Sequence, residues 1–184
     1  MAIVSIGLIE LTSIARGIET ADTMLKAGQV TLDFAKPVCP GKFIVMVHGD
    51  VGAMKAAVAA GLELGGAKVV NYLTIPRVHP TLIPAINAVL DAPQRVEALG
   101  VVEYFDIASA IVGADAAAKA SRIQLIEVRL GMGIGGKSFF KLCGEVADVR
   151  SAVQAAIDAG GERSTIVSTC VIPAPEPSLF KEML

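Results

Sequence analysis

The residues best placed to do chemistry lie in one stiff segment, Lys36–Lys42, which carries a cysteine at its centre. Pro37 and Pro40 restrict the backbone on either side of Cys39, and Gly41 permits a tight reversal. A thiol at the tip of such a turn is more exposed than a core thiol, and thiolates are the side chains that bind soft metals. Taken alone, however, these residues favour an ordinary hairpin with an incidental cysteine.

A second candidate is the segment Gly131–Ser138, which satisfies both the phosphate-loop pattern GxxxxGK[ST] and the pattern GxGxxG. Both patterns bind phosphate only where a helix follows the glycines, because the helix N-terminus supplies the amide groups. Here the next residues, Phe139–Leu142, predict a strand. Nucleotide binding is therefore disfavoured, and we expect the glycines to form a loop that packs closely against copies of itself.

The remaining reactive side chains do not form a catalytic group. Neither histidine has a second ligand close to it in sequence, and no serine has a recognisable nucleophile motif. Glu10 and Glu103 occupy equivalent places in a repeat, which indicates a structural role. Cys143 and Cys170 lie in apolar runs and are expected to be inert core thiols. We therefore predict that the protein is not an enzyme.

Composition excludes several classes of partner. The 184 residues are 53% hydrophobic with a net charge of −2 and no basic run, which argues against nucleic acid. The longest stretch without a charged residue, Val78–Leu90, is too short to cross a bilayer. Ala2–Ile9 lacks the basic flank of a signal peptide, so we expect none. Three widely spaced cysteines give no disulfide framework and suggest a reducing compartment.

The chain repeats itself at a spacing of about 93 residues. Gly7–Glu10 matches Gly100–Glu103, and Gly41-Lys42 matches Gly136-Lys137 after a short insertion. This period is too long for a solenoid unit and suits a duplicated small domain. We place the first domain at residues 1–91 and the second at 97–184, on either side of a polar stretch with a proline.

Each half is predicted to fold as β-α-β-β-α-β, an α/β (α+β) domain with a four-stranded antiparallel sheet and flanking helices. The predicted elements of the first half are strands at Ile3–Leu11, Val30–Ala35, Phe43–Val47 and Val69–Ile75, a helix ending at Gly28, a helix capped by Asp50, and a short helix after Pro80. A sheet covered by helices on one face leaves its other face and its edges open. We expect neighbouring subunits to cover them.

Four segments in this order resemble the domain of bacterial microcompartment shell proteins: Gly7–Glu10, Ala21–Ala27, Gly49–Ala53 and Ile75–Pro80. Two copies in one chain resemble the tandem-domain, trimer-forming branch of that family. Leu11–Ala15 and Cys39–Phe43 are similar to the members of that branch found in propanediol-utilisation microcompartments. The resemblance covers essentially the whole chain.

The resemblance implies a homotrimer with six domains around a central axis, a flat pseudo-hexameric tile in the shell of a bacterial microcompartment in the cytoplasm. Such tiles contact other microcompartment shell proteins laterally. Lys26 and Lys119 match the family's edge lysine, and Arg77 matches the arginine that reaches across the tile boundary. Ala174 stands where a second arginine would repeat, so edge contacts are expected to be uneven.

The resemblance also implies a metal centre. In similar proteins the cysteine matched by Cys39 lies at the threefold axis and, with its symmetry mates, holds an iron–sulfur cluster. We therefore expect one 4Fe–4S cluster per trimer with three Cys39 ligands, electron transfer across the shell, and an encapsulated redox enzyme as a partner. The residues expected around the central loops and pore are Val38, Pro40, Gly41, Gly131, Met132, Gly133, Ile134 and Gly135. The alternative is a gated pore for small metabolites without a cluster.

Overall fold

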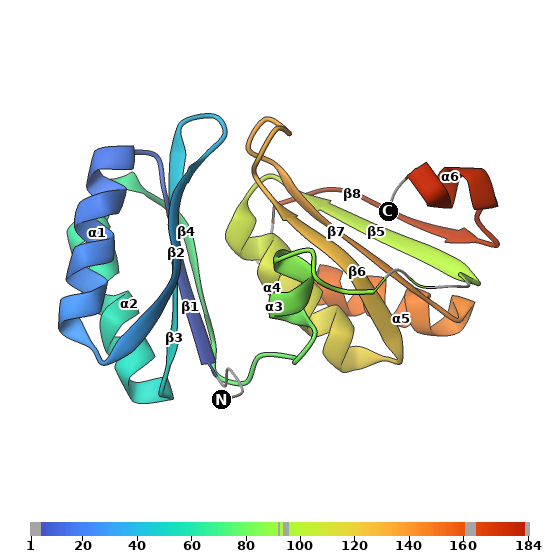
Figure 1. Ribbon diagram of the computed structural model, residues 1–184, viewed down its shortest axis with the longest axis horizontal. Helices are drawn as coiled ribbons and strands as arrows, with labels where there is room; N and C mark the ends of the chain where they lie inside the picture. The colour runs from blue at the N-terminus through green and yellow to red at the C-terminus, as the bar shows by residue number, and fades with distance from the viewer. Residues whose placement is uncertain (1–4, 92, 94–95, 161–164, 183–184) are drawn as a thin grey trace. The chain divides into compact units, whose positions relative to one another are not determined.

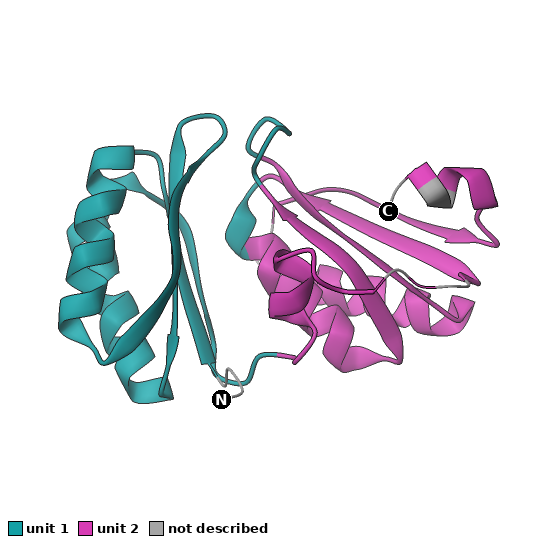
Figure 2. Ribbon diagram, in the orientation of Figure 1, with its two compact units in different colours: residues 1–78, 106–108, 131–136 teal, residues 79–105, 109–130, 137–184 magenta. Residues whose placement is uncertain are grey.

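The computed structural model describes residues 5–91, 93, 96–160 and 165–182. They form two compact units (Figure 2). The first unit is the chain up to Val78 together with Asp106–Ala108 and Gly131–Gly136, and the second is His79–Phe105, Ser109–Leu130 and the chain from Lys137 onward. Two short segments of the second sequence repeat thus belong structurally to the first unit.

The first unit is a four-stranded antiparallel sheet in the order β2-β3-β1-β4, with helices α1 and α2 against one face (Figure 1). Its elements are β1 (Ser5–Leu11), α1 (Ile14–Ala27), β2 (Val30–Val38), β3 (Lys42–Gly49), α2 (Val51–Gly65), the 3₁₀ turn η1 (Gly66–Lys68) and β4 (Val69–Ile75). The core between sheet and helices includes Ile9, Leu11, Met24, Val45 and Met54.

Local sequence explains why the helices begin and pack where they do. The Ser13 hydroxyl accepts a hydrogen bond from the Arg16 amide at 3.3 Å and caps α1, and the Asp50 carboxylate caps α2. Gly17 lets α1 lie directly on the sheet, because a Cβ there would come within 2.4 Å of the Phe43 ring. A larger residue at position 17 would therefore push α1 off the core.

The second unit repeats the same topology, with strand order β6-β7-β5-β8. Its elements are α3 (Leu82–Ile86), β5 (Ala98–Tyr104), most of α4 (Ile107–Ala120), β6 (Ile123–Leu130), β7 (Ser138–Gly144), α5 (Val146–Ala159), β8 (Ile166–Pro173) and α6 (Pro177–Glu182). A bulge lies between Leu32 and Phe34 in β2 and at the equivalent place, between Leu125 and Glu127, in β6. The duplication therefore holds down to single irregularities of the strands.

The predicted fold class and the two β-α-β-β-α-β copies are confirmed. The strand β2 runs to Val38, three residues beyond the predicted Ala35, and includes Pro37. This is possible because β2 is an edge strand, where proline's missing N–H costs no ladder bond. The domain boundaries at 91 and 97 stay a prediction, and residues 3–4 of the first strand, with 92 and 94 of the boundary stretch, lie outside the described residues.

The prediction for the cysteines is half right. Cys143 is buried, and burial raises the pKa of its thiol to about 11. Cys170 is exposed, so the expectation of a core thiol there is wrong. The reason is that β8 is an edge strand whose residues 168–170 are all exposed, and an apolar run alone does not distinguish an edge strand from a central one. No helix within the described ranges is long and apolar enough to span a membrane.

Candidate functional site

Cys39 lies in the turn between the edge strand β2 and the central strand β3. The Cys39–Pro40 peptide bond is cis, and Gly41 has a φ of 92°, a backbone conformation that favours glycine. The Gly41 amide donates to the Val38 carbonyl at 3.0 Å, which closes the turn. Val38 is buried, Cys39 is half-buried and Pro40 is exposed, so the turn is anchored at its base and presents the cysteine near its tip.

The glycine loop Gly131–Gly136 lies against this turn within the first unit. The Cys39 amide donates to the Gly131 carbonyl at 3.3 Å. Gly136 makes the closest approach, since a Cβ there would lie 2.5 Å from the Cys39 carbonyl oxygen. The loop was expected to pack closely against copies of itself. In the chain it packs against its counterpart from the other repeat.

The loop contains no helix and leads into β7, which confirms that the phosphate-loop pattern lacks its structural context. Four of its glycines have positive φ: Gly131, Gly133, Gly135 and Gly136. Gly131 is buried beneath the turn, where a Cβ would lie 3.2 Å from the Val38 Cβ. Met132, Gly133 and Gly135 are exposed and Ile134 is half-buried, so the outer surface of the loop consists of glycines and apolar side chains.

A buried ion pair fixes the base of the turn. The Lys42 ammonium binds the Glu10 carboxylate and also donates to the Gly136 carbonyl at 3.1 Å. The second oxygen of Glu10 accepts the Ile107 amide at 2.8 Å. Glu10 is fully buried, and this burial raises its pKa although Lys42 opposes the shift. One carboxylate thus connects strand β1, the Cys39 turn and the segment Asp106–Ala108.

Sequence reasoning assigned Glu10 a structural role but did not identify its partner. A signal was available, because the pairing recurs as Glu103 with Lys137 in the second repeat, at 2.5 Å. Lys42 and Lys137 each follow a turn glycine and form an ion pair with a glutamate. Lys137 therefore has a structural role and is not the lysine of a phosphate-binding loop.

The predicted tile-edge residues lie at other places in the fold. Lys26 and Lys119 are in the last turns of α1 and α4, where each pairs with an aspartate four residues earlier, Asp22 or Asp115. Arg77 follows β4 and is exposed. All three side chains are exposed at the surface of the chain, and their role at a tile edge stays a prediction.

Cys39 is a single donor in this chain. Within the ranges that the structure describes, no three or more His, Cys, Asp or Glu side chains lie together as a metal site. A half-buried thiol on a rigid turn suits a soft metal centre, but an iron–sulfur cluster needs several thiolates. The donor set fits such a cluster only where further copies of the chain bring their own Cys39.

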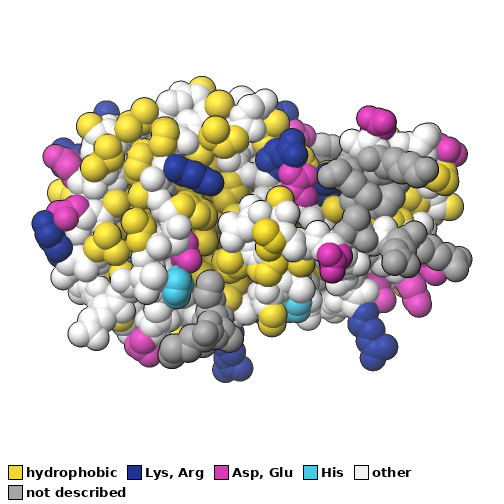
Figure 3. All heavy atoms as spheres, viewed as in Figure 1, with side chains coloured by type: hydrophobic (Ala, Val, Ile, Leu, Met, Phe, Trp, Pro, Cys, Tyr) yellow, Lys and Arg dark blue, Asp and Glu magenta, His cyan; other side chains and the backbone are white. Residues whose placement is uncertain are grey.

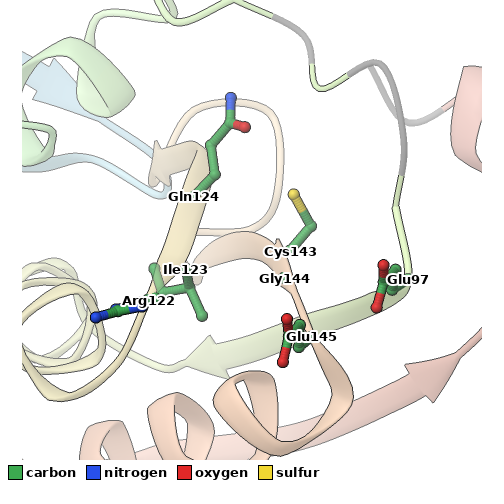
Figure 4. A pocket seen from close by; sticks show the side chains of 7 residues that line it. All are labelled: Glu97, Arg122, Ile123, Gln124, Cys143, Gly144 and Glu145. Atoms are coloured by element: carbon green, nitrogen blue, oxygen red, sulfur yellow. The ribbon is translucent and has the colours of Figure 1, made fainter.

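A separate pocket in the second unit contains Cys143. It is lined by Glu97, Arg122, Ile123, Gln124, Cys143, Gly144 and Glu145 (Figure 4). The raised pKa keeps the Cys143 thiol protonated near neutral pH, which makes it a poor nucleophile and a poor metal ligand. The Arg122 side chain points away from it. The arrangement therefore gives this pocket no activated nucleophile.

The family follows from comparison with known proteins. The family model of the BMC domain matches residues 5–78 and 98–175, one copy in each repeat. The chain belongs to the BMC domain family. The bacterial microcompartment shell protein PduT of Citrobacter freundii is 42% identical over 98% of this chain and 97% of its own length. The family resemblance predicted from the sequence is thereby confirmed over nearly the whole chain.

Comparison with solved structures supports the same family. A crystal structure of a microcompartment protein from Desulfitobacterium hafniense DCB is 50% identical, with a TM-score of 0.85 over 98% of this chain and 99% of that one. The fused permuted hexameric shell protein MSM0275 from the RMM microcompartment is 26% identical, with a TM-score of 0.62 over 84% and 79% of the two chains. The BMC chain described here is thus a structural shell protein of the PduT type, and its predicted location in the microcompartment shell is confirmed.

Proposed function

We propose that this BMC protein forms a homotrimeric shell tile whose three Cys39 thiolates hold one 4Fe–4S cluster at the threefold axis and allow electrons to cross the shell. The observation that carries the proposal is the half-buried Cys39 thiol, presented near the tip of a turn that is anchored by Val38, Gly136 and the Glu10–Lys42 pair. An encapsulated redox enzyme would be the partner on one side of the tile.

The chain's own contribution is to hold the thiol in place. Pro37 and Pro40 limit the conformations of the turn, and the hydrogen bond from the Cys39 amide to Gly131 fixes the backbone beside the ligand. When bound, such a cluster supplies one-electron transfer. Three cysteines would leave one iron to a non-protein ligand, so we expect the cluster to be sensitive to oxygen.

Anaerobic purification tests this proposal. We expect brown protein with an absorbance band at about 400 nm, where iron–sulfur charge transfer lies, and loss of the band on exposure to air. A colourless protein that contains no iron after strictly anaerobic preparation would contradict the cluster.

The second candidate function is a gated pore for small metabolites with no cluster. The observation that favours it is that the loop beside Cys39 is rich in glycine and partly exposed, with Met132, Gly133 and Gly135 at its surface. In that case Cys39 lines the pore. Iron-free anaerobic protein that still assembles into tiles would support this function.

The proposed tile also makes lateral contacts with other shell proteins through Lys26, Lys119 and Arg77. Lys26→Asp is expected to leave the trimer intact and to reduce the formation of extended sheets several-fold, because the ammonium would be lost from the tile edge. Part of the effect is local, since a cation at the end of α1 favours the helix by about 0.3–1 kcal/mol.

Electron microscopy measures the formation of extended sheets, and light scattering measures separately whether the trimer is intact. Lys55→Asp, which makes the same charge change on an exposed residue of α2, is the control and is expected to form sheets normally. If Lys26→Asp forms sheets like the parent, Lys26 is only a solvated residue at a helix end.

A further inference from the structure

The sign of φ alternates along the glycine loop Gly131–Gly136. Three of its glycines have positive φ: Gly131 (67°), Gly133 (73°) and Gly135 (66°). Met132 and Ile134, which lie between them, have negative φ, and Met132–Gly136 are turn residues. In turns that alternate in this way, successive amides point toward one side and form a concavity that binds anions. The loop thus shares a feature of phosphate-binding loops, although no helix follows it.

The loop uses its end carbonyls within the fold and leaves its central amides open. The Gly131 carbonyl accepts the Cys39 amide at 3.3 Å, and the Gly136 carbonyl accepts the Lys42 ammonium at 3.1 Å. The four amides between these ends donate no hydrogen bond to the described residues: Met132, Gly133, Ile134 and Gly135. A Cβ on either of these two glycines would meet no atom within 4 Å. Four adjacent donors are therefore open to a ligand.

Both ends of the loop contact the same residue, Cys39. At one end its amide donates to Gly131, and at the other end a Cβ on Gly136 would lie 2.5 Å from its carbonyl oxygen. The turn and the loop both belong to the first unit, coloured teal in Figure 2. The four open amides lie between the two contacts, so the donors and the cysteine belong to one site. Figure 3 shows the side-chain types on the face of the molecule seen in Figure 1.

The two hairpin loops are equivalent in the repeat and carry complementary groups. The turn of the first repeat has a thiol and two prolines, Pro37 and Pro40, which lack an N–H. The loop of the second repeat has no thiol and presents the four open amides. Lys42, at the base of the turn, is already paired with Glu10. The first repeat can therefore supply a metal ligand, and the second supplies hydrogen-bond donors beside it.

We infer that the open amides of Met132–Gly135 donate hydrogen bonds to sulfur atoms of the cluster at Cys39 and favour its reduced state. This inference rests on the proposed function and gives the glycine loop a tuning role in it. Hydrogen bonds from amides to cluster sulfurs stabilise the negative charge that one electron from a reductant adds. The loop therefore raises the reduction potential of the site.

The surroundings of the loop fit a cluster better than a phosphate group. A phosphate-binding loop adds a helix N-terminus and an available lysine to its amides. Here β7 follows the loop, and Lys137 forms an ion pair with Glu103 at 2.5 Å. Backbone nests without a helix occur at iron–sulfur sites. The residue that would bind the iron, Cys39, also lies directly against the loop.

Proline substitution removes these amides one at a time. Met132 and Ile134 suit it, because their φ is negative and their N–H groups donate to no described residue. Met132→Pro and Ile134→Pro are each expected to weaken the preference for the reduced state about 10-fold, relative to alanine at the same position, which keeps the amide. For one electron this is a potential about 59 mV lower. Redox titration of anaerobic protein, followed by electron paramagnetic resonance, measures it.

Iron analysis and circular dichroism of the same samples show whether the proline variants keep the cluster and the fold. If they keep both, and their potentials equal those of Met132→Ala and Ile134→Ala, the tuning role is overturned while the cluster at Cys39 stands. A parent protein without iron overturns both the proposed function and the tuning role.

A measurement on the unaltered loop decides the case in which proline prevents cluster binding. Parent protein labelled with nitrogen-15 methionine and isoleucine is expected to show nitrogen-15 couplings to the reduced cluster in pulsed paramagnetic resonance, because a hydrogen bond transmits spin density to the amide nitrogen. These couplings should disappear in the double variant Met132→Ala/Ile134→Ala, in which both labelled amides are replaced. A parent whose reduced cluster shows no such coupling overturns the inference.

Discussion

Cys39→Ser is expected to reduce the iron of anaerobically prepared protein to less than about a tenth of the parent value while the chain keeps its fold and its assembly. Serine is nearly isosteric with cysteine, and a hydroxyl is a poor iron–sulfur ligand at neutral pH. The shape of the turn depends on Pro40, Gly41 and the close approach of Gly136 rather than on the thiol. Iron analysis and circular dichroism of the same samples measure the two properties.

The other two cysteines are the matched controls. Cys143→Ser places a hydroxyl at a buried strand position and is expected to cost roughly 1–3 kcal/mol of stability without loss of iron. Cys170→Ser is expected to change neither the stability nor the iron content, because that side chain is exposed on the edge strand β8. Iron retained in the Cys39 variant and lost in either control would show that the cluster is held elsewhere.

The second large effect is expected at the base of the same turn. Lys42→Met should destabilise the fold by about 3–5 kcal/mol, because it leaves the fully buried Glu10 carboxylate without its cation. Urea unfolding at a fixed chain concentration measures this free energy. The double variant with Glu10→Gln should recover much of the loss, since no buried charge is then left unpaired.

The pH dependence of the Lys42→Met variant gives a second readout. Burial already raises the pKa of Glu10 above its usual value of 4.5, and loss of Lys42 removes an opposing influence. The folded state then holds the Glu10 proton more tightly than the unfolded state. Stability from this group is present below the ordinary pKa and is lost as pH rises through the raised one.

We expect the other shifted carboxyls to titrate alike in both proteins, because Lys42 is not among the causes of their shifts, so the difference between the two pH profiles reports on Glu10. The pKa of Asp33 is raised by burial. Burial also raises the pKa of Glu127, but the hydrogen bonds and charges of Lys141 and Arg129 together lower it below its usual value. A loss of less than about 1 kcal/mol in Lys42→Met, with a profile parallel to the parent's, would mean that the ion pair is not important for the turn.

Much of the fold could be predicted from local pattern. The repeat, the strand and helix periods and the turn residues all favoured the same tandem domain, which the structure confirms. The prediction failed at Cys170, because an apolar run on an edge strand looks like one in a core. Edge position depends on the order of strands in the sheet, and no single run of residues contains that order.

The Cys39 turn shows where sequence reasoning about the site stops. Its shape followed from Pro37, Pro40 and Gly41, but its contact with Gly131–Gly136 did not, since the two segments lie far apart in the chain. The Glu10–Lys42 pair spans 32 residues and depends on the register between strands β1 and β3. Only the recurrence of a glutamate and a lysine in both repeats pointed to it. The metal role of Cys39 came from family resemblance.

The ratio of iron and acid-labile sulfide to chain, in anaerobic protein whose assembly mass is known from light scattering, tests the central claim most directly. A cluster shared by three copies of Cys39 predicts about four irons and four sulfides for every three chains, in a particle with the mass of a trimer. A trimer without iron or sulfide, or iron bound one-to-one with the chain and without sulfide, would contradict a shared cluster at Cys39.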